Sequence, residues 1–596
     1  MRVYPTGTVK YNPQKCYNGI NLVSTSKDGA LITDMNGVEL KRFLFNPMPA
    51  KMFPNGNIMG INAFRSSDFG VSDGLKLVEI TKQGQVVWSF DQFKYMQDRG
   101  YRPKWMARAH SDYQREGNPT GYYIPGEKTV KEPHTLLLVH DTVVVPSISD
   151  KELLDDVILE VDYDGNILWK FSFSEHFEEF GFSEESKNVI YRNPNLRNTD
   201  KPLGNYLDIT SISLLGENKW YDQGDFRFHP DNIIFTARQA NIIGIIDKKS
   251  SSIIHKMGPD FKDFEKTGPI IGSAHAHLIP KGLPGEGNLL IFDNGGMCGY
   301  GAPNGLSPTG LSPYVRPFSR ILEIHPITMD ILWSIDPRDF GYSLPINGYK
   351  FYSPYAGNLQ RLPNGNTLIT MATDGMVLEV TQEKEVVWQW INPYKTDREN
   401  LLWNHLVYAS YRYPYEYLDY QEGKEISVIG EENCNFRLPH AAAFGSKEVI
   451  SVENASISED IDVITMESEL NREVQFKKEI IRRNQSVIKY INQNNFTEKI
   501  RSCQKAIVIF GAKRCLHCPP LMELLTTLLE TEFQEVHGFY MDVDLNKAFA
   551  KEHEINTLPQ TVFYRQGKKV YSFVGEDSYD SIADHIDKYL LEKNEK

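Results

Sequence analysis

The feature that most constrains the fold is a repeated pair of apolar strands. Each copy has an apolar strand, a polar turn and a second apolar strand that usually ends near a tryptophan. Apolar and polar residues that alternate on both sides of a turn predict a β-hairpin. The copies lie at residues 31–43, 77–90, 157–171, 242–258, 321–335 and 377–391.

A second strand–turn–strand element accompanies each hairpin. Two copies share a Pro-Asn-Gly-Asn turn, and four are looser. Four strands repeated six times are typical of a six-bladed β-propeller, an all-β fold, and two unrelated β-sandwiches are the alternative. The irregular stretches between copies are then insertions, which often carry function. The second elements lie at 50–61, 132–146, 211–237, 275–292, 358–371 and 436–452, and the insertions at 92–131, 175–205 and 296–318.

The pattern changes after about residue 455. A charged segment with helical character is followed by strands that alternate with helices up to the C-terminus. This alternation indicates a separate α/β domain. We therefore expect a multidomain chain with a propeller over residues 1–460, a helical linker over 461–490 and an α/β domain over 491–596.

Composition narrows the classes of protein that fit. The net charge of −14 argues against a nucleic-acid partner, because binding to a phosphate backbone needs positive charge. No stretch approaches 18 uncharged apolar residues, so no membrane span is expected. The first residues lack the apolar core of a secretory signal, which favours a cytoplasmic location. Six cysteines are too few for a disulfide scaffold.

Two of these cysteines form a Cys-x-x-Cys motif at Cys515 and Cys518. Cys515 follows a predicted buried strand and stands at the start of a predicted helix, whose N-terminus would lower the pKa of the first thiol. A structural zinc site is an alternative that requires a second pair of ligands. The only candidate zinc ligands near the motif are His517 and Cys503. A pair of cysteines without any chemical role is a third alternative.

The string AKRCLHC, followed by NTLPQTVFY, resembles the thioredoxin family over roughly residues 480–596. The resemblance implies that Cys515 is the attacking thiol, Cys518 is the resolving thiol, and Pro559 is the cis-proline beside them. It also implies a thiol or disulfide protein as a partner.

Two residues depart from the thioredoxin pattern. Arg514 replaces the usual tryptophan before the first cysteine and adds positive charge there, and Ile509 replaces a buried aspartate. These departures leave the direction of the redox chemistry open.

Histidines recur where the propeller axis is expected. The first strand of each blade lines the central channel, so equivalent positions in the six blades form a ring. His277 shares a strand face with His275, because side chains alternate with a period of two. Imidazole can be a nucleophile, an acid or base, or a metal ligand, although a single one is more often a core residue. His110, in the first insertion, either joins this site or lies in an exposed loop. The ring is predicted to contain Pro49, His134, Thr210, His275, Asn358 and His440.

The strings PTGTVKYNPQKCYNG, QREGNPTGYY, GENKWYDQGDFRFHPDNI and AHLIPKGLPGEGNLLIFDNGG resemble the bacterial aryl-sulfate sulfotransferase family. The resemblance covers about residues 4–430. Its members transfer a sulfuryl group between phenolic compounds through a sulfated histidine and without a nucleotide donor. It implies small aromatic substrates, His440 as nucleophile, and His275 and His277 in the fourth-blade motif, with His134 as a further catalytic candidate in the ring.

The remaining substrate-binding candidates follow from this chemistry. Arg320 and Arg412 carry forked donors suited to sulfuryl oxygens, although structural ion pairs are equally expected. Asn358 belongs to the ring. Asp208 and Thr210 stand where many family members have a histidine and an asparagine in the third blade. A carboxylate there would repel sulfate, which argues against unchanged sulfotransfer.

Two other functions stay open. His134, His275, His277 and His440 are predicted to surround one zinc, copper or iron ion in a metal enzyme or binder, where Asp208 would help. Alternatively, the propeller is non-catalytic and docks partners for the thioredoxin-like domain.

Overall fold

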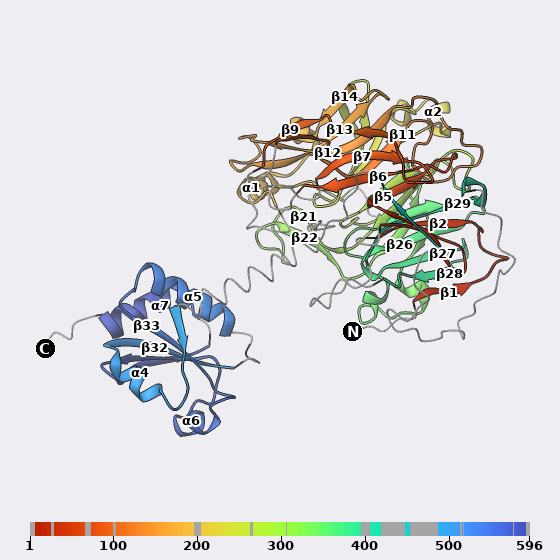
Figure 1. Ribbon diagram of the computed structural model, residues 1–596. Coiled ribbons are helices and arrows are strands. Elements are labelled where there is room, and N and C mark those ends of the chain that lie inside the picture. The colour runs from red at the N-terminus through yellow and green to blue at the C-terminus, as the bar shows by residue number, and fades with distance from the viewer. Residues whose placement is uncertain are drawn as a thin grey trace. The chain divides into compact units, whose positions relative to one another are not determined.

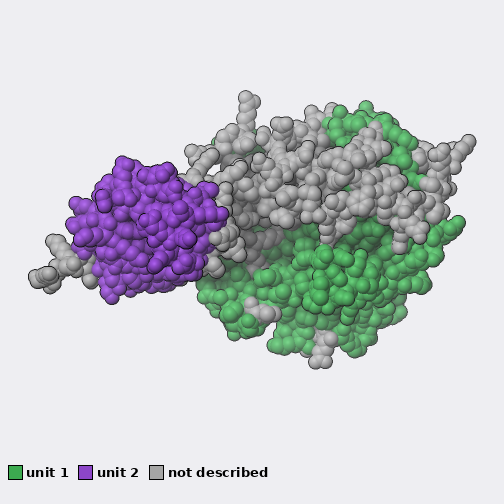
Figure 2. Space-filling view, turned by 90° about the horizontal axis from the view of Figure 1, so that it is seen from below, with its two compact units in different colours: residues 1–467 green, residues 468–596 purple. Residues whose placement is uncertain are grey.

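The chain divides into two compact units, Met1–Glu467 and Ser468–Lys596 (Figure 2). No helix among the placed residues is long and apolar enough to cross a membrane. The computed structural model describes residues 6–25, 29–65, 73–98, 103–195, 204–262, 266–305, 307–394, 406–418, 447–452, 487–512, 515, 518–575 and 577–591.

The first unit is an all-β, propeller-like arrangement (Figure 1). Four separate sheets have four or five strands each, where the sequence predicts six separate blades. One sheet contains, in spatial order, β1 (Gly7–Tyr11), β28 (Val386–Ile391), β27 (Met376–Val380), β26 (Thr367–Met371) and β25 (Asn358–Arg361). Another contains β29 (Val407–Tyr413), β2 (Ile20–Thr25), β3 (Ala30–Thr33), β4 (Glu39–Leu44) and β30 (Glu448–Ser451).

The other two separate sheets have four strands each. One contains β15 (Ile209–Leu214), β16 (Ile233–Ala237), β17 (Ile242–Asp247) and β18 (Ser252–Met257). The other contains β19 (His275–Leu278), β20 (Leu289–Asp293), β23 (Arg320–Ile324) and β24 (Ile331–Ile335).

Two of the predicted blades are joined in one eight-stranded sheet. Ala109 pairs with Gly74 across strands β11 and β7, and this bridge connects the two groups of four strands. The count of six separate sheets is therefore wrong. The eight strands are β5 (Asn46–Met52), β6 (Ile58–Phe64), β7 (Gly74–Ile80), β8 (Val86–Phe90), β11 (Ala109–Arg115), β12 (Thr135–Val143), β13 (Leu153–Val161) and β14 (Ile167–Ser172).

All six predicted hairpins are present as antiparallel pairs: β3–β4, β7–β8, β13–β14, β17–β18, β23–β24 and β27–β28. Each pair also contains one register shift near its turn. The repeated sequence thus gives the same strand pairing and the same local irregularity in every copy.

The second copy of the other repeated element was placed wrongly. Residues 132–146 were expected to turn, but β12 runs unbroken for nine residues and pairs with β11, which lies inside the predicted insertion 92–131. His140 and Asp141 resemble turn residues in sequence, yet both are buried within the strand. The first strand of this group is therefore β11.

The predicted insertions contain short elements. Two small hairpins pair β9 (Lys94–Met96) with β10 (Lys104–Met106), and β21 (Gly296–Tyr300) with β22 (Leu311–Arg316). The helices and helical turns of this unit are η1 (Phe173–Phe180), α1 (Glu184–Arg192), α2 (Lys219–Asp222), η2 (Phe226–Phe228), η3 (Pro337–Phe340), η4 (Gly348–Phe351), η5 (Ala372–Asp374) and η6 (Tyr415–Leu418).

A buried ion pair recurs between neighbouring groups of strands. In three hairpin copies a glutamate on the first hairpin strand pairs with an arginine on the first strand of the next group. Two of these arginines also lie over a tryptophan, Arg115 over Trp88 and Arg412 over Trp388. The repeat therefore carries the contact that joins adjacent groups as well as the hairpins. The pairs are Glu79–Arg115 (2.6 Å), Glu323–Arg361 (2.5 Å) and Glu379–Arg412.

The second unit is an α/β domain with a thioredoxin fold. Its sheet has the order β31-β33-β32-β34-β35, with β31 and β32 parallel to β33 and β34 antiparallel to β32. The strands are β31 (Ile488–Tyr490), β32 (Lys505–Gly511), β33 (His537–Asp542), β34 (Gln560–Arg565) and β35 (Lys568–Val574). The helices are α4 (Phe496–Ser502), α5 (Cys518–Thr531), α6 (Lys547–Glu552), α7 (Tyr579–Ile586) and η8 (Asp587–Leu591).

The predicted helical linker over 461–490 needs a correction at its end. Ile488–Tyr490 form strand β31, because these residues pair with β33 and Ile488 is buried in the core of the domain. Residues 461–486 lie outside the described part of the chain.

Candidate functional site

A pocket opens where the first strands of the six groups converge. It encloses about 690 Å³, the open space at its mouth included. The first strands β5, β11, β15, β19, β25 and β29 all contribute, together with His140 of β12, so the pocket lies where the sequence places the axis. Among its lining residues are Pro49, His110, Ser111, Asp112, His140, Asp208, Thr210, His275, Asn358, Tyr408 and Tyr411.

His275 presents one ring nitrogen to this pocket. The backbone N–H of Leu359 donates to Nδ1 at 3.2 Å. Burial, with the nearby Lys51 ammonium as a second cause, lowers the pKa of His275 to about 3. The ring is therefore neutral near pH 7, and with Nδ1 accepting, its proton is on Nε2. His275 is thus arranged as a hydrogen-bond donor.

His277 lies behind His275, with ring centroids 4.9 Å apart. Its Nε2 is 2.9 Å from the Tyr122 hydroxyl, and its side chain is fully buried. Burial lowers its pKa well below the usual range, with the charge of His275 as the second cause. His277 does not line the pocket, so it supports the site from within the channel.

The other two predicted histidines are not shown at the pocket. The side chain of His134 is 45% exposed and its Nδ1 lies 3.3 Å from Glu160, away from the lining residues. This follows from the misplaced strand, since His110 on β11 occupies the corresponding part of the ring. His440 lies outside the described residues. His134 therefore does not belong to the metal site that the sequence predicts from His134, His275, His277 and His440.

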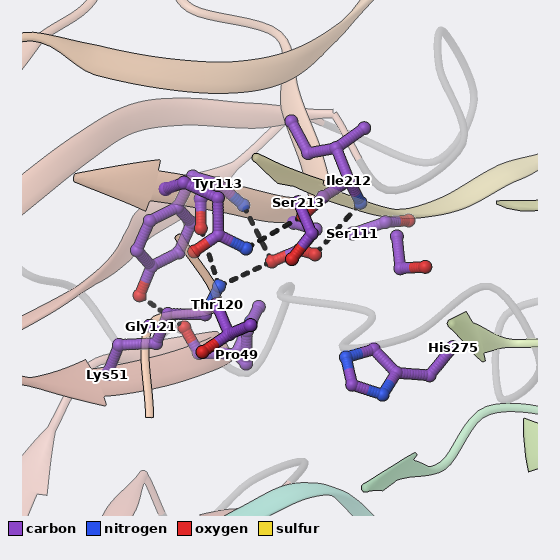
Figure 3. A network of polar contacts seen from close by, with 12 residues as sticks. Pro49, Lys51, Ser111, Tyr113, Thr120, Gly121, Ile212, Ser213 and His275 are labelled. Atoms are coloured by element: carbon purple, nitrogen blue, oxygen red, sulfur yellow. Dashed lines mark hydrogen bonds and ion pairs between the residues drawn. The ribbon is translucent and has the colours of Figure 1, made fainter. Parts of the chain in front are cut away.

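A buried cluster forms one wall below the mouth of the pocket. Lys51 donates to Asp112 Oδ1 at 2.6 Å and to the carbonyl of Tyr113 at 2.5 Å, while the N–H of Ile212 donates to Asp112 Oδ2 at 3.0 Å. Figure 3 shows the ring of His275 apart from this cluster. The Lys51 ammonium is only 2% exposed, so it acts on the pocket through its charge.

Three predicted substrate-binding residues line the pocket, but their polar atoms are largely engaged. The Asn358 amide donates to the carbonyl of Ser410 and accepts from its N–H, which joins β25 to β29. Asp208 pairs with Arg238 at 2.5 Å. The hydroxyl of Thr210 contacts that of Thr236 at 2.9 Å.

The two predicted sulfuryl-binding arginines make structural ion pairs. Arg320 binds Asp293 at 2.6 Å and donates to two backbone carbonyls. Arg412 binds Glu379 and donates to Asn21 at 2.8 Å, and its side chain is fully buried. Neither lines the pocket.

Three tyrosines line the same pocket as the histidines. Tyr408 and Tyr411 reach the pocket from β29, and Tyr355 lines it from the loop before β25. Burial raises the pKa of Tyr408 and Tyr411, so both hydroxyls stay protonated. Aromatic surface combined with a few polar groups is the lining expected around a small aromatic ligand.

A second group of residues lies at the same pocket: His110, for which the sequence left a place in the site open, and His140 and Asp156, which sequence reasoning missed. His110 and His140 stack with ring centroids 3.6 Å apart, and Asp156 Oδ1 lies 3.2 Å from Nε2 of His110. All three are buried. The alternation in AHSDYQR and the polar pair inside LLLVHDTV were the available signals, but both segments were assigned to loops or turns.

In the second unit Cys515 and Cys518 form a disulfide, with their Cα atoms 5.6 Å apart. The described part of helix α5 spans Cys518–Thr531 and so contains the second cysteine. Cys515 is partly exposed, whereas Cys518 is 3% exposed. Pro559 is buried and its peptide bond is cis, as predicted. Arg514 and His517 lie outside the described residues.

Both units match known families. Residues 127–393 match the family model described as Arylsulfotransferase (ASST), and residues 487–588 match the one described as Thioredoxin. A thioredoxin of Staphylococcus haemolyticus is 28% identical over 100 residues, which cover 17% of this chain and 95% of the relative. A thioredoxin of Chlamydia trachomatis is 26% identical over 103 residues, covering 17% of this chain and 99% of the relative. A solved N21Q mutant thioredoxin from Halobacterium salinarum is 25% identical, covers 17% of this chain and 88% of its own, and has a TM-score of 0.16.

Proposed function

Because the chain joins an arylsulfotransferase-family region at residues 127–393 to a thioredoxin domain at 487–588, we propose that it is a sulfotransferase with an attached redox domain. The substrates are small phenolic compounds, and the reaction takes place in the pocket where the first strands converge. The observation that carries this proposal is a buried neutral imidazole, His275, that lines one pocket together with three tyrosines.

Sulfuryl transfer requires a hydrogen-bond donor of the kind that the neutral imidazole of His275, with its proton on Nε2, provides. As the S–O bond of an aryl sulfate breaks, negative charge grows on the phenolic oxygen. A preorganised donor aimed at that oxygen stabilises the transition state, and a neutral imidazole with a lowered pKa can supply it. We assign this role to Nε2–H of His275, whose Nδ1 is occupied by Leu359.

The nucleophile is a separate histidine in this proposal. His275 donates through Nε2, so that nitrogen has no free lone pair with which to attack sulfur. The family resemblance assigns the attack to His440. Its ring nitrogen would bond to sulfur as the phenolate leaves, and a second phenol would then take the sulfuryl group and restore the imidazole. Asn358, Asp208 and Thr210 would border the substrate.

Transfer from 4-nitrophenyl sulfate to a phenol acceptor tests the role of His275. His275→Gln should lower kcat by about 10²–10³-fold, the loss typical of removing one such donor. His134→Gln is the matched control and should retain activity, because His134 lies away from the pocket. Equal activity of wild type and His275→Gln would refute the assignment.

For the second unit we propose thiol–disulfide exchange with a protein partner. Cys515 is the more exposed sulfur, so its thiolate would attack a partner disulfide and form a mixed disulfide. The thiolate of Cys518 would then attack the sulfur of Cys515, release the reduced partner and close the Cys515–Cys518 bond. Cys518→Ser should trap the mixed disulfide and Cys515→Ser should not, and trapping through Cys518 alone would reverse the assignment.

A further inference from the structure

Among the residues that the structure describes, the carboxylate of Asp156 beside the pocket forms no ion pair with a lysine or arginine. The neighbouring carboxylates do: Asp73 pairs with Arg65 and Arg108, and Asp208 pairs with Arg238. The ion-pair contacts of Asp156 among the described residues are with His110 and His140 alone. Asp156 is 1% exposed, and buried carboxylates are normally paired or bound to a metal.

The atoms that face one another here are all ligand atoms. Nε2 of His110 and Nε2 of His140 lie 3.2 and 3.6 Å from Asp156 Oδ1. Neither His110 Nε2 nor Asp156 Oδ1 makes a hydrogen bond within the described chain, although both are buried. One ligand atom from each of the three residues lies within 4.8 Å of the other two.

The opposite nitrogens of both rings are held by other groups. His140 Nδ1 lies 2.7 Å from Asp73 Oδ1, and His110 Nδ1 lies 3.1 Å from the Ser111 hydroxyl. A carboxylate on one imidazole nitrogen fixes the proton there and leaves the other nitrogen as a ligand, which is the usual support of a metal-bound histidine. Asp73 is itself held by Arg65 and Arg108.

From this arrangement we propose that His110, His140 and Asp156 bind a divalent first-row transition metal ion. Two imidazoles and one carboxylate suit iron(II) or zinc and leave further coordination positions free. His110 and His140 both line the pocket, so those positions would face a ligand there. The rings are stacked within 8° of parallel, so binding would tilt them toward a common point.

The proposed metal site does not depend on the proposed transfer of a sulfuryl group. It also differs from the channel set expected from the sequence, since it uses neither His275 nor His277. A proton shared between Asp156 and the imidazoles is the competing explanation. Burial and the charge of Asp208 raise the pKa of Asp156 well above its usual range, which agrees with either occupant.

The test uses the full chain with Cys515→Ser and Cys518→Ser, so that these two thiols bind no metal. The protein is treated with chelator, dialysed and titrated with Zn²⁺ in a calorimeter, and Co²⁺ is added separately as a spectroscopic probe. We expect one ion per chain, with affinity lowered more than about 100-fold in His110→Ala and His140→Ala, because loss of a direct ligand exceeds the 10–100-fold cost of an outer contact. His134→Ala and His275→Ala should bind as the parent does.

X-ray absorption of the bound Zn²⁺ keeps the test decisive if a variant fails to fold. Two imidazole ligands and one carboxylate oxygen are expected for the parent chain. Absence of stoichiometric binding, or binding that is unchanged in His110→Ala and His140→Ala, would overturn the metal site and favour the shared proton. Loss of binding in His275→Ala alone would move the ion to the channel histidines.

Discussion

Replacing Arg412 by methionine should lower the stability of the first unit. If Arg412 were a substrate ligand, the replacement would instead affect substrate binding alone. Arg412 and Glu379 are both 0% exposed, and Arg412 also donates to Asn21 and lies over Trp388. Methionine keeps an unbranched apolar stem but lacks the guanidinium, so it leaves the Glu379 charge buried without its cation. Breaking one partner of a buried pair costs about 3–5 kcal/mol, so the free energy of unfolding should fall by that amount.

The repeat supplies matched comparisons for this variant. Arg361→Met and Arg115→Met break equivalent pairs, whose glutamates are 7% and 12% exposed. Water can partly solvate those carboxylates, so the losses should rank Arg412, then Arg361, then Arg115. Adding Glu379→Gln to Arg412→Met should recover about 1–3 kcal/mol, because glutamine removes the unpaired charge and keeps an oxygen for the N–H of Tyr17.

Urea unfolding followed by tryptophan fluorescence measures these changes in the intact chain. All 8 tryptophans lie before residue 468, so the signal reports the first unit alone. If Arg412→Met unfolds at the same urea concentration as wild type and loses only sulfotransfer, Arg412 is a substrate ligand and the structural explanation is wrong.

Four further results are expected. His275 is neutral in the folded protein above about pH 3, so sulfotransfer should lose no rate through this group between pH 8 and pH 5. In the unfolded chain His275 takes up a proton near its ordinary pKa of 6.5, whereas in the folded protein its pKa is about 3. As the pH falls from 6.5 to 3, the free energy of unfolding should therefore fall by up to about 5 kcal/mol more in the wild type than in His275→Gln, measured by urea unfolding at each pH. Equal losses would show that the pKa of His275 in the folded protein is ordinary. Gly511→Ala should destabilise the second unit by about 1–3 kcal/mol in calorimetry, because the added Cβ would lie 2.8 Å from Cys518 Sγ and 2.7 Å from Tyr540. Phe510→Leu is a nearby core change without that contact, and an unaltered Tm in Gly511→Ala would contradict the packing. His134→Ala should change the free energy of unfolding by less than about 1 kcal/mol, because its Glu160 contact is largely exposed to water, and a larger loss by urea unfolding would show that this pair has a structural role.

The repeated hairpins were predictable because each carries its pairing information locally. Alternation and turn residues determine which two strands pair, and the six copies agree with one another. Two of the first strands, β11 and β29, were harder to find, since the strands that they pair with lie farther away in sequence. Strand β29 pairs with β2, which lies near the other end of the propeller-like unit in sequence, and β11 is separated from β12 by a long loop.

The same difficulty explains the errors at the site. His134 was placed in the ring because His140 and Asp141 resemble a turn, and correcting that strand puts His110 there. The role of Arg412 was open to sequence reasoning, since Arg115 and Arg361 face the equivalent glutamates. His110, His140 and Asp156 lie on three strands, β11, β12 and β13. They meet only when both strand pairings have the right register, and no local sequence pattern specifies that.

Mass measurement of the intact chain after reaction with 4-nitrophenyl sulfate, without a phenol acceptor, tests the central claim most directly. The account predicts one added sulfuryl group per chain, borne by a histidine, removed when a phenol is added and formed far more slowly in His275→Gln. Turnover without any mass gain, or labelling at the same rate in His275→Gln, would contradict it.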